Sequence, residues 1–266
     1  MGRVFASSDW HGCGNVADKV FGFLKKDDTL YFIGDAIDRG PDGIKIMNKL
    51  LTDSRVIYMK GNHEAFMEGS VPYLIEGRHS GNSGLWLGVN GGDQTWTAME
   101  HMSDESKMWY VDKIRHMPIE QIYTSPAGHS VILEHAGYSP FDIPHRSHDP
   151  LWDRDHFFDE WDYGFERDGL DAETTYLVHG HTPIQYLRFS YGYKGQPATR
   201  DKDEMIIKHQ FEKYGYTDWK PEVLRYCDGH KFDIDMCTIA SGRIALLDLD
   251  TFKTIYFDDD IKEAVI

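Results

Sequence analysis

Side chains able to bind metal ions recur along the chain, each a few residues after a short apolar run. Carboxylate and amide oxygens combined with imidazole suit Mn²⁺, Fe or Zn²⁺ better than metals that prefer thiolate ligands. Six such ligands are too many for one catalytic ion that keeps open positions, and they fit two ions about 3.5–4 Å apart with one bridging carboxylate. The sequence therefore predicts a dinuclear metal site. Its candidate ligands are Asp9, His11, Asp35, Asn62, His135 and His181.

The loop 34–40 concentrates charge, because it holds Asp35, Asp38 and Arg39. It directly follows the apolar run 30–33, which has the length and composition of a buried strand. In open α/β sheets, ligand sites lie outside the carboxyl ends of the strands. We therefore expect this loop to open onto such a site.

The elements that carry these residues follow an α/β pattern. In the first 64 residues, strand, polar loop and helix alternate, which is typical of a parallel sheet. Two later apolar runs lead to His135 and His181 in the same way, and alternating residues near the C-terminus predict antiparallel strands. The expected strands are 3–6, 29–33, 55–59, 131–133, 175–178, 237–240, 243–249 and 253–257, and the expected helices begin at 14 and 41.

Two long segments interrupt this pattern. Residues 65–117 predict a mainly helical insertion with glycine-rich breaks at 81–84 and 88–92. Its methionine and aromatic residues favour a small core, and a groove that sorts substrates is the alternative. Residues 186–230 are rich in Tyr and Lys, and they either lie beside the metals and shape substrate access or pack away from the site. With no repeat or low-complexity linker, one domain, 1–266, is expected.

Composition argues against several other classes of protein. The 266 residues are 41% hydrophobic, which is enough for a sizeable core. The formal net charge of −16 argues against nucleic-acid binding, because neutralising phosphates takes clustered Lys and Arg. We expect no membrane span and no signal peptide, since no long apolar run is present. Three scattered cysteines form neither a disulfide framework nor a metal motif, so we expect a cytoplasmic setting, and the oligomeric state stays open.

The candidate ligands belong to five short motifs, which are Asp9-x-His11-Gly12, Gly34-Asp35-x-x-Asp38-Arg39-Gly40, Gly61-Asn62-His63-Glu64, His135-Ala136-Gly137 and Gly180-His181-Thr182. In this order the motifs resemble the phosphoprotein phosphatase (PPP) family of calcineurin-like metallophosphoesterases. The resemblance is closest to the bacterial and lambda-phage-type serine/threonine phosphatases. It spans about residues 3–182, and residues 234–249 look like the closing strands of that family. It implies a four-layer α/β/β/α sandwich with the metals at its apex.

The resemblance also implies how the ligands divide between two divalent ions. One carboxylate would bridge them, and together they would activate a hydroxide as the nucleophile. The first ion would be held by Asp9, His11 and Asp35, and the second by Asp35, Asn62, His135 and His181.

Further motif residues are implied to act on the substrate. Arg39 and Arg154, together with Asn62, would bind the phosphoryl oxygens, to which the guanidinium group is suited. His63 would protonate the leaving alkoxide, and Asp38 would orient His63 and favour its charged form.

Two positions depart from the usual pattern. Ser8 stands where the PPP family usually has Gly, which should cost little unless this position needs a positive φ. Pro183 follows Thr182 where many other metallophosphoesterases have a further metal-binding His. This difference supports the PPP branch and predicts a first metal with fewer protein ligands.

The resulting functional prediction is metal-dependent hydrolysis of phosphate monoesters, with phosphoserine and phosphothreonine in proteins as the leading substrates and Mn²⁺ as the leading metal. The alternative is a hydrolase of dinucleotide polyphosphates like the symmetrical diadenosine tetraphosphatases. Those enzymes typically have Ala-Arg-Gly in place of Asp38-Arg39-Gly40 and Asn-His-Asp in place of Asn62-His63-Glu64. A third reading is a non-catalytic binding protein on an inherited phosphatase fold, but such proteins usually lose ligands and none is missing here.

Overall fold

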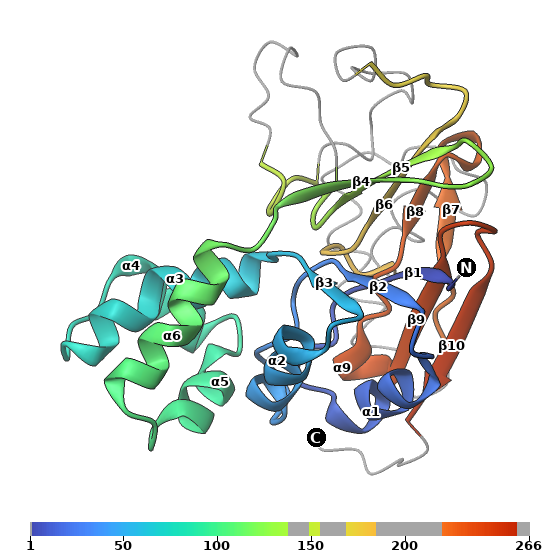
Figure 1. Cartoon of the computed structure of the whole chain (residues 1–266). Coiled ribbons are helices and arrows are strands. Elements are labelled where there is room, and N and C mark those ends of the chain that lie inside the picture. Colours follow the sequence, from blue (N-terminus) through green and yellow to red (C-terminus); the bar gives the residue numbers. More distant parts are fainter. Residues whose placement is uncertain (1, 138–148, 155–168, 185–219, 260–266) are drawn as a thin grey trace, which may run out of the picture.

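Two five-stranded sheets make up the centre of the computed structural model, which describes residues 2–137, 149–154, 169–184 and 220–259 (Figure 1). The first sheet has the order β10-β9-β1-β2-β3, and the second has the order β4-β5-β6-β8-β7. Each sheet has three parallel strands, completed by antiparallel ones. The strands are β1 (Val4–Ser7), β2 (Thr29–Phe32), β3 (Val56–Tyr58), β4 (Glu120–Thr124), β5 (Ser130–Glu134), β6 (Thr175–His179), β7 (Leu224–Tyr226), β8 (Lys231–Asp233), β9 (Arg243–Asp248) and β10 (Thr254–Asp258).

Alternating side chains give the first sheet two buried faces. Leu30 and Phe32 of β2 belong to a core shared with the helices. Ile33, directly after β2, belongs to a second core, and Tyr31 packs against that core. The second core also contains Leu133 of β5 and therefore joins the two sheets. Because neighbouring side chains of a strand point to opposite faces, a strand buried on both sides reads as a continuous apolar run. The predicted α/β architecture with two packed sheets is confirmed.

Helices α1 (Gly14–Phe23) and α2 (Gly43–Thr52) cover the outer face of the first sheet (Figure 1). Val20 of α1 and Met47 of α2 are fully buried there. The connections from β1 to α1, residues 8–13, and from β2 to α2, residues 33–42, carry their polar residues away from the ends of the two strands.

The predicted helical insertion is confirmed, and its core is continuous with that of the first sheet. Met67, Trp86 and Met99 are fully buried in the same cluster as Phe32 and Met47. The insertion is therefore packed onto the main core, not around a separate one. Its helices are α3 (Asn62–Ile75), α4 (Gly81–Gly88), α5 (Gly92–Met99) and α6 (Asp104–Arg115).

Two local predictions are wrong. The expected break at 81–84 lies inside α4, because the hydroxyl of Ser80 accepts the N–H of Ser83 at 3.1 Å and caps the helix start. The expected strand 237–240 is instead the short helix α9 (Thr238–Ser241). There the carboxylate of Asp235 accepts the N–H of Cys237 at 2.7 Å and turns the chain before a strand can form.

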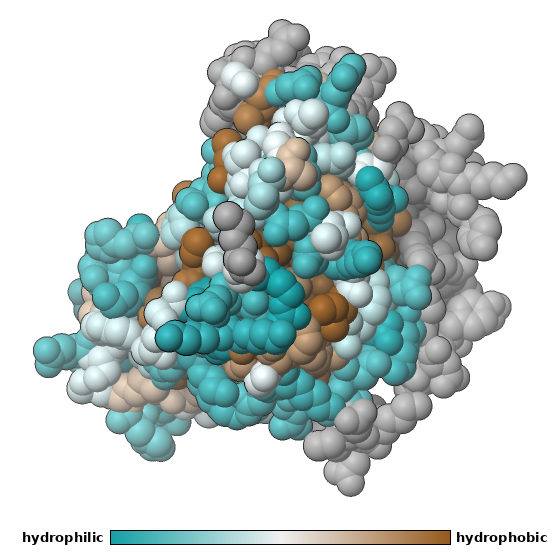
Figure 2. Space-filling model, turned by 45° about the vertical axis from the view of Figure 1, so that its right-hand side comes forward, coloured by the Kyte–Doolittle hydropathy of each residue, from teal (hydrophilic) through white to brown (hydrophobic). Residues whose placement is uncertain are grey.

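Some predictions concern parts of the chain that the structure does not describe. They concern most of the Tyr-rich segment, residues 185–219. Among the described residues, none forms a helix with the length and apolar character needed to cross a membrane. The described face in Figure 2 is largely hydrophilic, with smaller hydrophobic areas between the polar ones.

Candidate metal centre and active site

The carboxyl ends of parallel strands from both sheets meet at one place. The first sheet contributes four of the predicted ligands, and the second contributes two. All six side chains are buried, with exposed fractions between 0% and 7%. They are Asp9 and His11 after β1, Asp35 after β2, Asn62 after β3, His135 after β5 and His181 after β6.

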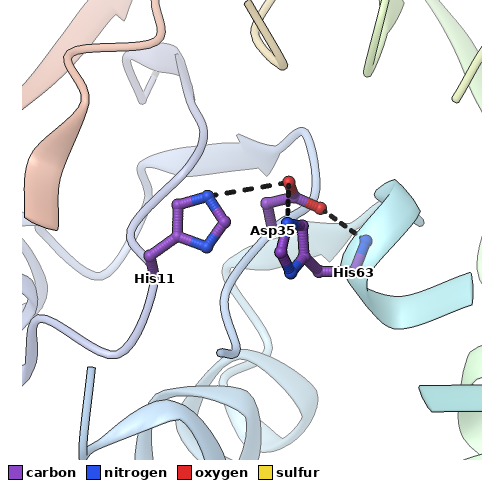
Figure 3. Close-up of side chains that lie close together, drawn as sticks. All are labelled: His11, Asp35 and His63. Carbon is purple, nitrogen blue, oxygen red and sulfur yellow. Dashed lines mark hydrogen bonds and ion pairs between the residues drawn. The ribbon is translucent and has the colours of Figure 1, made fainter. Parts of the chain in front are cut away.

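The carboxylate of Asp35 is the centre of this cluster. Its Oδ2 atom lies 3.7 Å from Nε2 of His11 and 3.4 Å from Nε2 of His135. Figure 3 shows the carboxylate between the side chains of His11 and His63, and its Oδ1 accepts the backbone N–H of His63 at 3.0 Å. Two groups with metal-ligand spacing share Asp35, which are His11, Asp35 and His63 in one and Asp35, His135 and His181 in the other. Asp35 is therefore the residue that the two groups have in common.

Asn62 brings together the two histidines of the second sheet. Its Oδ1 atom lies 2.8 Å from Nε2 of His135 and 2.9 Å from Nδ1 of His181. Because Asp35 Oδ2 also faces His135, one amide oxygen, one carboxylate oxygen and two ring nitrogens converge. These are the ligand types that suit a divalent metal ion.

Backbone carbonyls orient two of the imidazole rings. Nδ1 of His11 lies 3.0 Å from the carbonyl of Ile37, and Nδ1 of His135 lies 2.7 Å from the carbonyl of Ile33. A hydrogen bond at Nδ1 turns Nε2 of each ring toward Asp35 and leaves it for a metal. Nε2 of His11 also lies 3.8 Å from Oδ1 of Asp9, the other candidate ligand that follows β1.

Negative charge is concentrated in this buried region. Burial raises the pKa of Asp9, and the neighbouring carboxylates of Asp235 and Asp35 raise it further. Burial would also raise the pKa of Asp35, yet the charges of His135 and His63 hold it well below its usual range. Buried carboxylates need compensating positive charge. The donor set therefore fits divalent cations.

The backbone at the site is strained. Six residues that bear functional side chains have positive φ angles, between 40° and 71°. This left-handed region is uncommon for residues other than glycine, and it persists only where the surroundings enforce it. Ser8 is not among them, so the serine in place of the usual glycine brings no such strain. The six are Asp9, His11, Asp35, Asp38, Arg39 and His181.

Backbone hydrogen bonds hold the strained loops together. The N–H groups of Asp9 and His11 donate to the carbonyls of Gly34 and Asp35, both at 3.1 Å. Gly12 has a φ of 71°, and a Cβ there would lie 2.3 Å from the carbonyl oxygen of Gly40. The loops after β1 and β2 therefore approach so closely that only glycine fits at Gly12.

The sequence reasoning assigned no role to Glu64, which supports the loop of Asp35. Its carboxylate accepts the N–H groups of Asp35, Ala36 and Gly61 at 2.8–2.9 Å, and the hydroxyl of Tyr58 at 2.8 Å. Glu64 is fully buried. Its place in the quoted Asn-His-Glu motif was the only signal for it.

Asp235 is a second buried carboxylate near the cluster that sequence reasoning did not single out. It follows β8 as the ligands follow their strands, and it is 2% exposed. Burial raises its pKa to about 6. Its position after an apolar residue at a strand end could have indicated it.

His63 and Asp38 form a pair beside the metal ligands. Nδ1 of His63 donates to Oδ2 of Asp38 at 2.6 Å, and both side chains are buried. The guanidinium of Arg39 reaches Nε2 of His63 at 3.2 Å and Nε2 of His11 at 3.0 Å. The charged loop predicted from the sequence therefore does face the cluster.

Arg154 lies beside the part of the cluster that holds His181. Its Nη1 donates to Oγ1 of Thr182 at 2.9 Å, next to His181. Two residues before it, the ring of Trp152 lies edge-on to His181, with 5.9 Å between ring centroids, and is 41% exposed. The two arginines thus approach the cluster from different loops.

A two-sheet α/β fold that gathers carboxylates, histidines and an asparagine at its strand ends, with arginines beside them, defines a metal-dependent phosphoesterase. The family model of the calcineurin-like phosphoesterases matches residues 2–234. The chain belongs to this family, and the predictions of a metallophosphoesterase and of a hydrolytic enzyme are confirmed.

Curated relatives are similar over parts of the chain. Serine/threonine-protein phosphatase 1 of Salmonella typhimurium (strain LT2) is 28% identical over 192 residues, which are 69% of this chain and 80% of the relative. Serine/threonine-protein phosphatase 2 of Escherichia coli (strain K12) is 31% identical over 99 residues, covering 36% of this chain and 39% of the relative.

Solved structures show the same fold. One is the crystal structure of a protein described as a candidate diadenosine tetraphosphatase, with a TM-score of 0.52 and 16% sequence identity. The match covers 97% of this chain and 95% of the chain in that structure. The cold-active protein-tyrosine phosphatase of a psychrophilic Shewanella species has a TM-score of 0.50 at 14% identity, covering 97% of this chain and 81% of its own. At these identities the likeness concerns the fold alone.

Proposed function

We propose that this protein is a metal-dependent serine/threonine phosphatase that hydrolyses phosphate monoesters. The observation that carries the proposal is the 2.6 Å hydrogen bond between His63 Nδ1 and Asp38 Oδ2, beside the ligand cluster around Asp35. A histidine held by its own carboxylate is suited to protonate the alkoxide that leaves when a phosphate monoester is cleaved. The two curated relatives named as serine/threonine phosphatases support the same substrate class.

The convergence of ligand atoms supports two metal positions that share one carboxylate. When bound, two divalent ions would polarise the phosphoryl group and provide an activated water. Mn²⁺ is our proposed metal, with Fe and Zn²⁺ as the alternatives, because these ligands suit all three. The residues proposed for the first position are Asp9, His11 and Asp35, and those for the second are Asp35, Asn62, His135 and His181.

The remaining polar groups have proposed roles on the substrate. Arg39 and Arg154, with Asn62, bind the phosphoryl oxygens, since guanidinium groups match phosphate geometry and neutralise its charge. Arg39, whose Nη2 now lies 3.2 Å from Nε2 of His63, would turn to the phosphoryl oxygens when substrate binds. Nε2 of the protonated His63 would then give its proton to the leaving oxygen, and Asp38 holds the ring in place through Nδ1. Arg39 and Arg154 stand on different loops, which supports their binding of one phosphoryl group from two directions.

The proposal is tested by turnover of p-nitrophenyl phosphate and of a phosphoserine peptide with added Mn²⁺. Asp35→Asn should lower kcat by at least about a thousandfold, because it removes charge that a bridging ligand supplies to both ions. Asp18→Asn is the matched control, since Asp18 is exposed on α1 and pairs with Lys45 and Lys49. Equal activity of Asp35→Asn and the wild type would refute the proposal.

The dinucleotide alternative is decided by parallel rates on a phosphopeptide and on diadenosine tetraphosphate. The hydrogen-bonded pair of His63 and Asp38 favours hydrolysis of phosphate monoesters. The alanine that is typical of the tetraphosphatases at position 38 could not accept a hydrogen bond from His63. Faster hydrolysis of the dinucleotide would reverse this assignment. We also propose a cytoplasmic setting, which the small number of cysteines and their wide spacing along the sequence support.

A further inference from the structure

The carboxylate of Asp38 is held by side chains of the helical insertion. The indole N–H of Trp86 donates to Oδ2 of Asp38 at 2.7 Å. The hydroxyl of Thr95 donates to Oδ1 at 2.6 Å and accepts the backbone N–H of Asp38 at 2.9 Å. Asp38, Trp86 and Thr95 are all between 0% and 1% exposed. Each oxygen of this buried carboxylate therefore has a donor from the insertion.

These donors fix the orientation of the Asp38 carboxylate. Oδ2 receives both the indole N–H of Trp86 and Nδ1 of His63, and Oδ1 is occupied by Thr95. With both oxygens engaged, rotation of the carboxylate would break a buried hydrogen bond and leave its donor unpaired. The ring of His63 is thereby fixed as firmly as the carboxylate it binds.

The connection between α4 and α5 also holds Arg39. The backbone N–H of Arg39 donates to the carbonyl of Gly91 at 3.0 Å. Gly91 has a φ of 77°, and a Cβ there would lie 2.9 Å from Cγ and N of Arg39. Gly91 therefore lets the insertion approach the loop closely. At the next residue, Gly92, a Cβ would lie 2.4 Å from Nε1 of Trp86, so this glycine leaves room for the indole within the insertion.

We propose that two residues of the α4–α5 segment (residues 80–99), Trp86 and Thr95, are positioning residues for proton donation by His63. The inference rests on the proposed phosphatase function. When the P–O bond to the leaving group breaks, the proton on Nε2 of His63 moves to the departing oxygen, and water supplies the new P–O bond. Trp86 and Thr95 keep Asp38, and through it His63, aligned for this transfer.

A packing role alone does not account for these contacts. The ring of Trp86 fills the shared core, as any large apolar side chain could, but its N–H is aimed at a carboxylate. Thr95 lies 57 residues from Asp38 in sequence and meets it with both hydrogen-bonding capacities of its hydroxyl. The polar atoms, not the apolar surface, are therefore the parts to remove in a test.

The test compares two aryl esters with the Mn²⁺-loaded full-length protein. Phenyl phosphate has a basic leaving group that needs a proton donor, whereas 2,4-dinitrophenyl phosphate has a leaving group that does not. Trp86→Phe and Thr95→Val should each lower kcat on phenyl phosphate roughly 10-fold to 100-fold and change kcat on the dinitrophenyl ester less than about 3-fold. Thr95→Ser should restore the wild-type ratio, because it returns the hydroxyl.

Trp96→Phe is the matched control, since Trp96 is on the same segment and lies under Lys107 instead of Asp38. Its ratio of the two rates should equal that of the wild type. Equal losses on both esters in Trp86→Phe and Thr95→Val, or no loss on either, would overturn the inference. Turnover of the dinitrophenyl ester also reports that each variant has folded. If the wild type cleaves aryl esters but no phosphopeptide, the proposed phosphoprotein substrate is refuted. The comparison of the two aryl esters still tests the roles of Trp86 and Thr95.

Discussion

Glu64 shows how a residue that need not touch the substrate can support the site. Its two oxygens accept three backbone N–H groups from the loops after β2 and β3. Those loops carry Asp35 and Asn62, so the geometry of two proposed ligands depends on one buried carboxylate. No other described side chain is hydrogen-bonded to the backbone N–H of Asp35.

Replacing Glu64 by Gln is expected to lower the free energy of unfolding by about 2–4 kcal/mol. The amide NH₂ cannot accept, so it would face N–H donors and leave them unpaired in the interior. Tyr58→Phe, which removes the hydroxyl donor at 2.8 Å, is the control and should cost about 1 kcal/mol. Urea denaturation in the presence of a chelator measures both, and a loss in Glu64→Gln no larger than in Tyr58→Phe would contradict this reading.

At the scale of elements, the site depends on how closely the loops after β1 and β2 approach. The N–H of Gly12 donates to the carbonyl of Ala36 at 2.9 Å, and the N–H of Gly40 donates to the carbonyl of His11 at 3.0 Å. These bonds continue the pairing of β1 and β2 beyond the strands themselves. The parallel sheet thus extends its hydrogen bonding to the residues that carry the chemistry.

Gly12→Ala is expected to destabilise the protein by at least about 2 kcal/mol, because it adds strain at positive φ and a clash with Gly40. Gly22→Ala is the matched control, since Gly22 is exposed in α1 and a Cβ there meets nothing within 4 Å. It should stabilise the protein by about 0.5–1 kcal/mol. Melting temperatures of the two variants in one buffer give the comparison, and a shift of the same sign in both would be inconsistent with it.

The same scale shows what the sequence can and cannot predict. The strand ends that carry Asp9, Asp35 and His135 follow from local apolar runs and the polar residues after them. The contacts of Trp86 and Thr95 do not, since they lie 48 and 57 residues from Asp38 and nothing local relates them. The short helix α9 was misassigned because a side-chain contact of Asp235, not a periodic pattern, turns the chain.

At the scale of the whole molecule, the cluster joins the two sheets. The first sheet supplies Asp35 and Asn62, and the second supplies His135 and His181, which meet them within 3.4 Å. The apolar core between the sheets lies directly behind them. Metal ions held by both sides would therefore stabilise the packing of one sheet on the other.

Saturating Mn²⁺ is expected to raise the melting temperature by about 5–10 °C, because an ion present at 100 times its Kd adds about 2.7 kcal/mol to the native state. A chelator should reverse the rise, and Asp35→Asn should lack it. Differential scanning calorimetry with and without Mn²⁺ checks this, with Mg²⁺ as a comparison. An Asp35→Asn protein that responds like the wild type would place the ions elsewhere.

The size of this effect should increase with pH. Burial lowers the pKa of His135, but the charge of Asp35 outweighs it and raises the pKa to about 10. In the absence of metal the ring is therefore protonated at pH 7, and a metal must displace that proton to bind Nε2. The affinity should rise about tenfold per pH unit below this pKa. Titration calorimetry in two buffers of different ionisation enthalpy should detect the released proton.

The left-handed backbone of six functional residues has a consequence for attempts to engineer this protein. Gly adopts that conformation at less cost than Asp, His or Arg does. Variants selected only for thermal stability would therefore accumulate replacements at positions such as Asp9, Asp35 and Asp38. These variants would lose activity as their thermal stability increases. A useful screen must select for turnover and thermal resistance together, because at these positions the two requirements oppose each other.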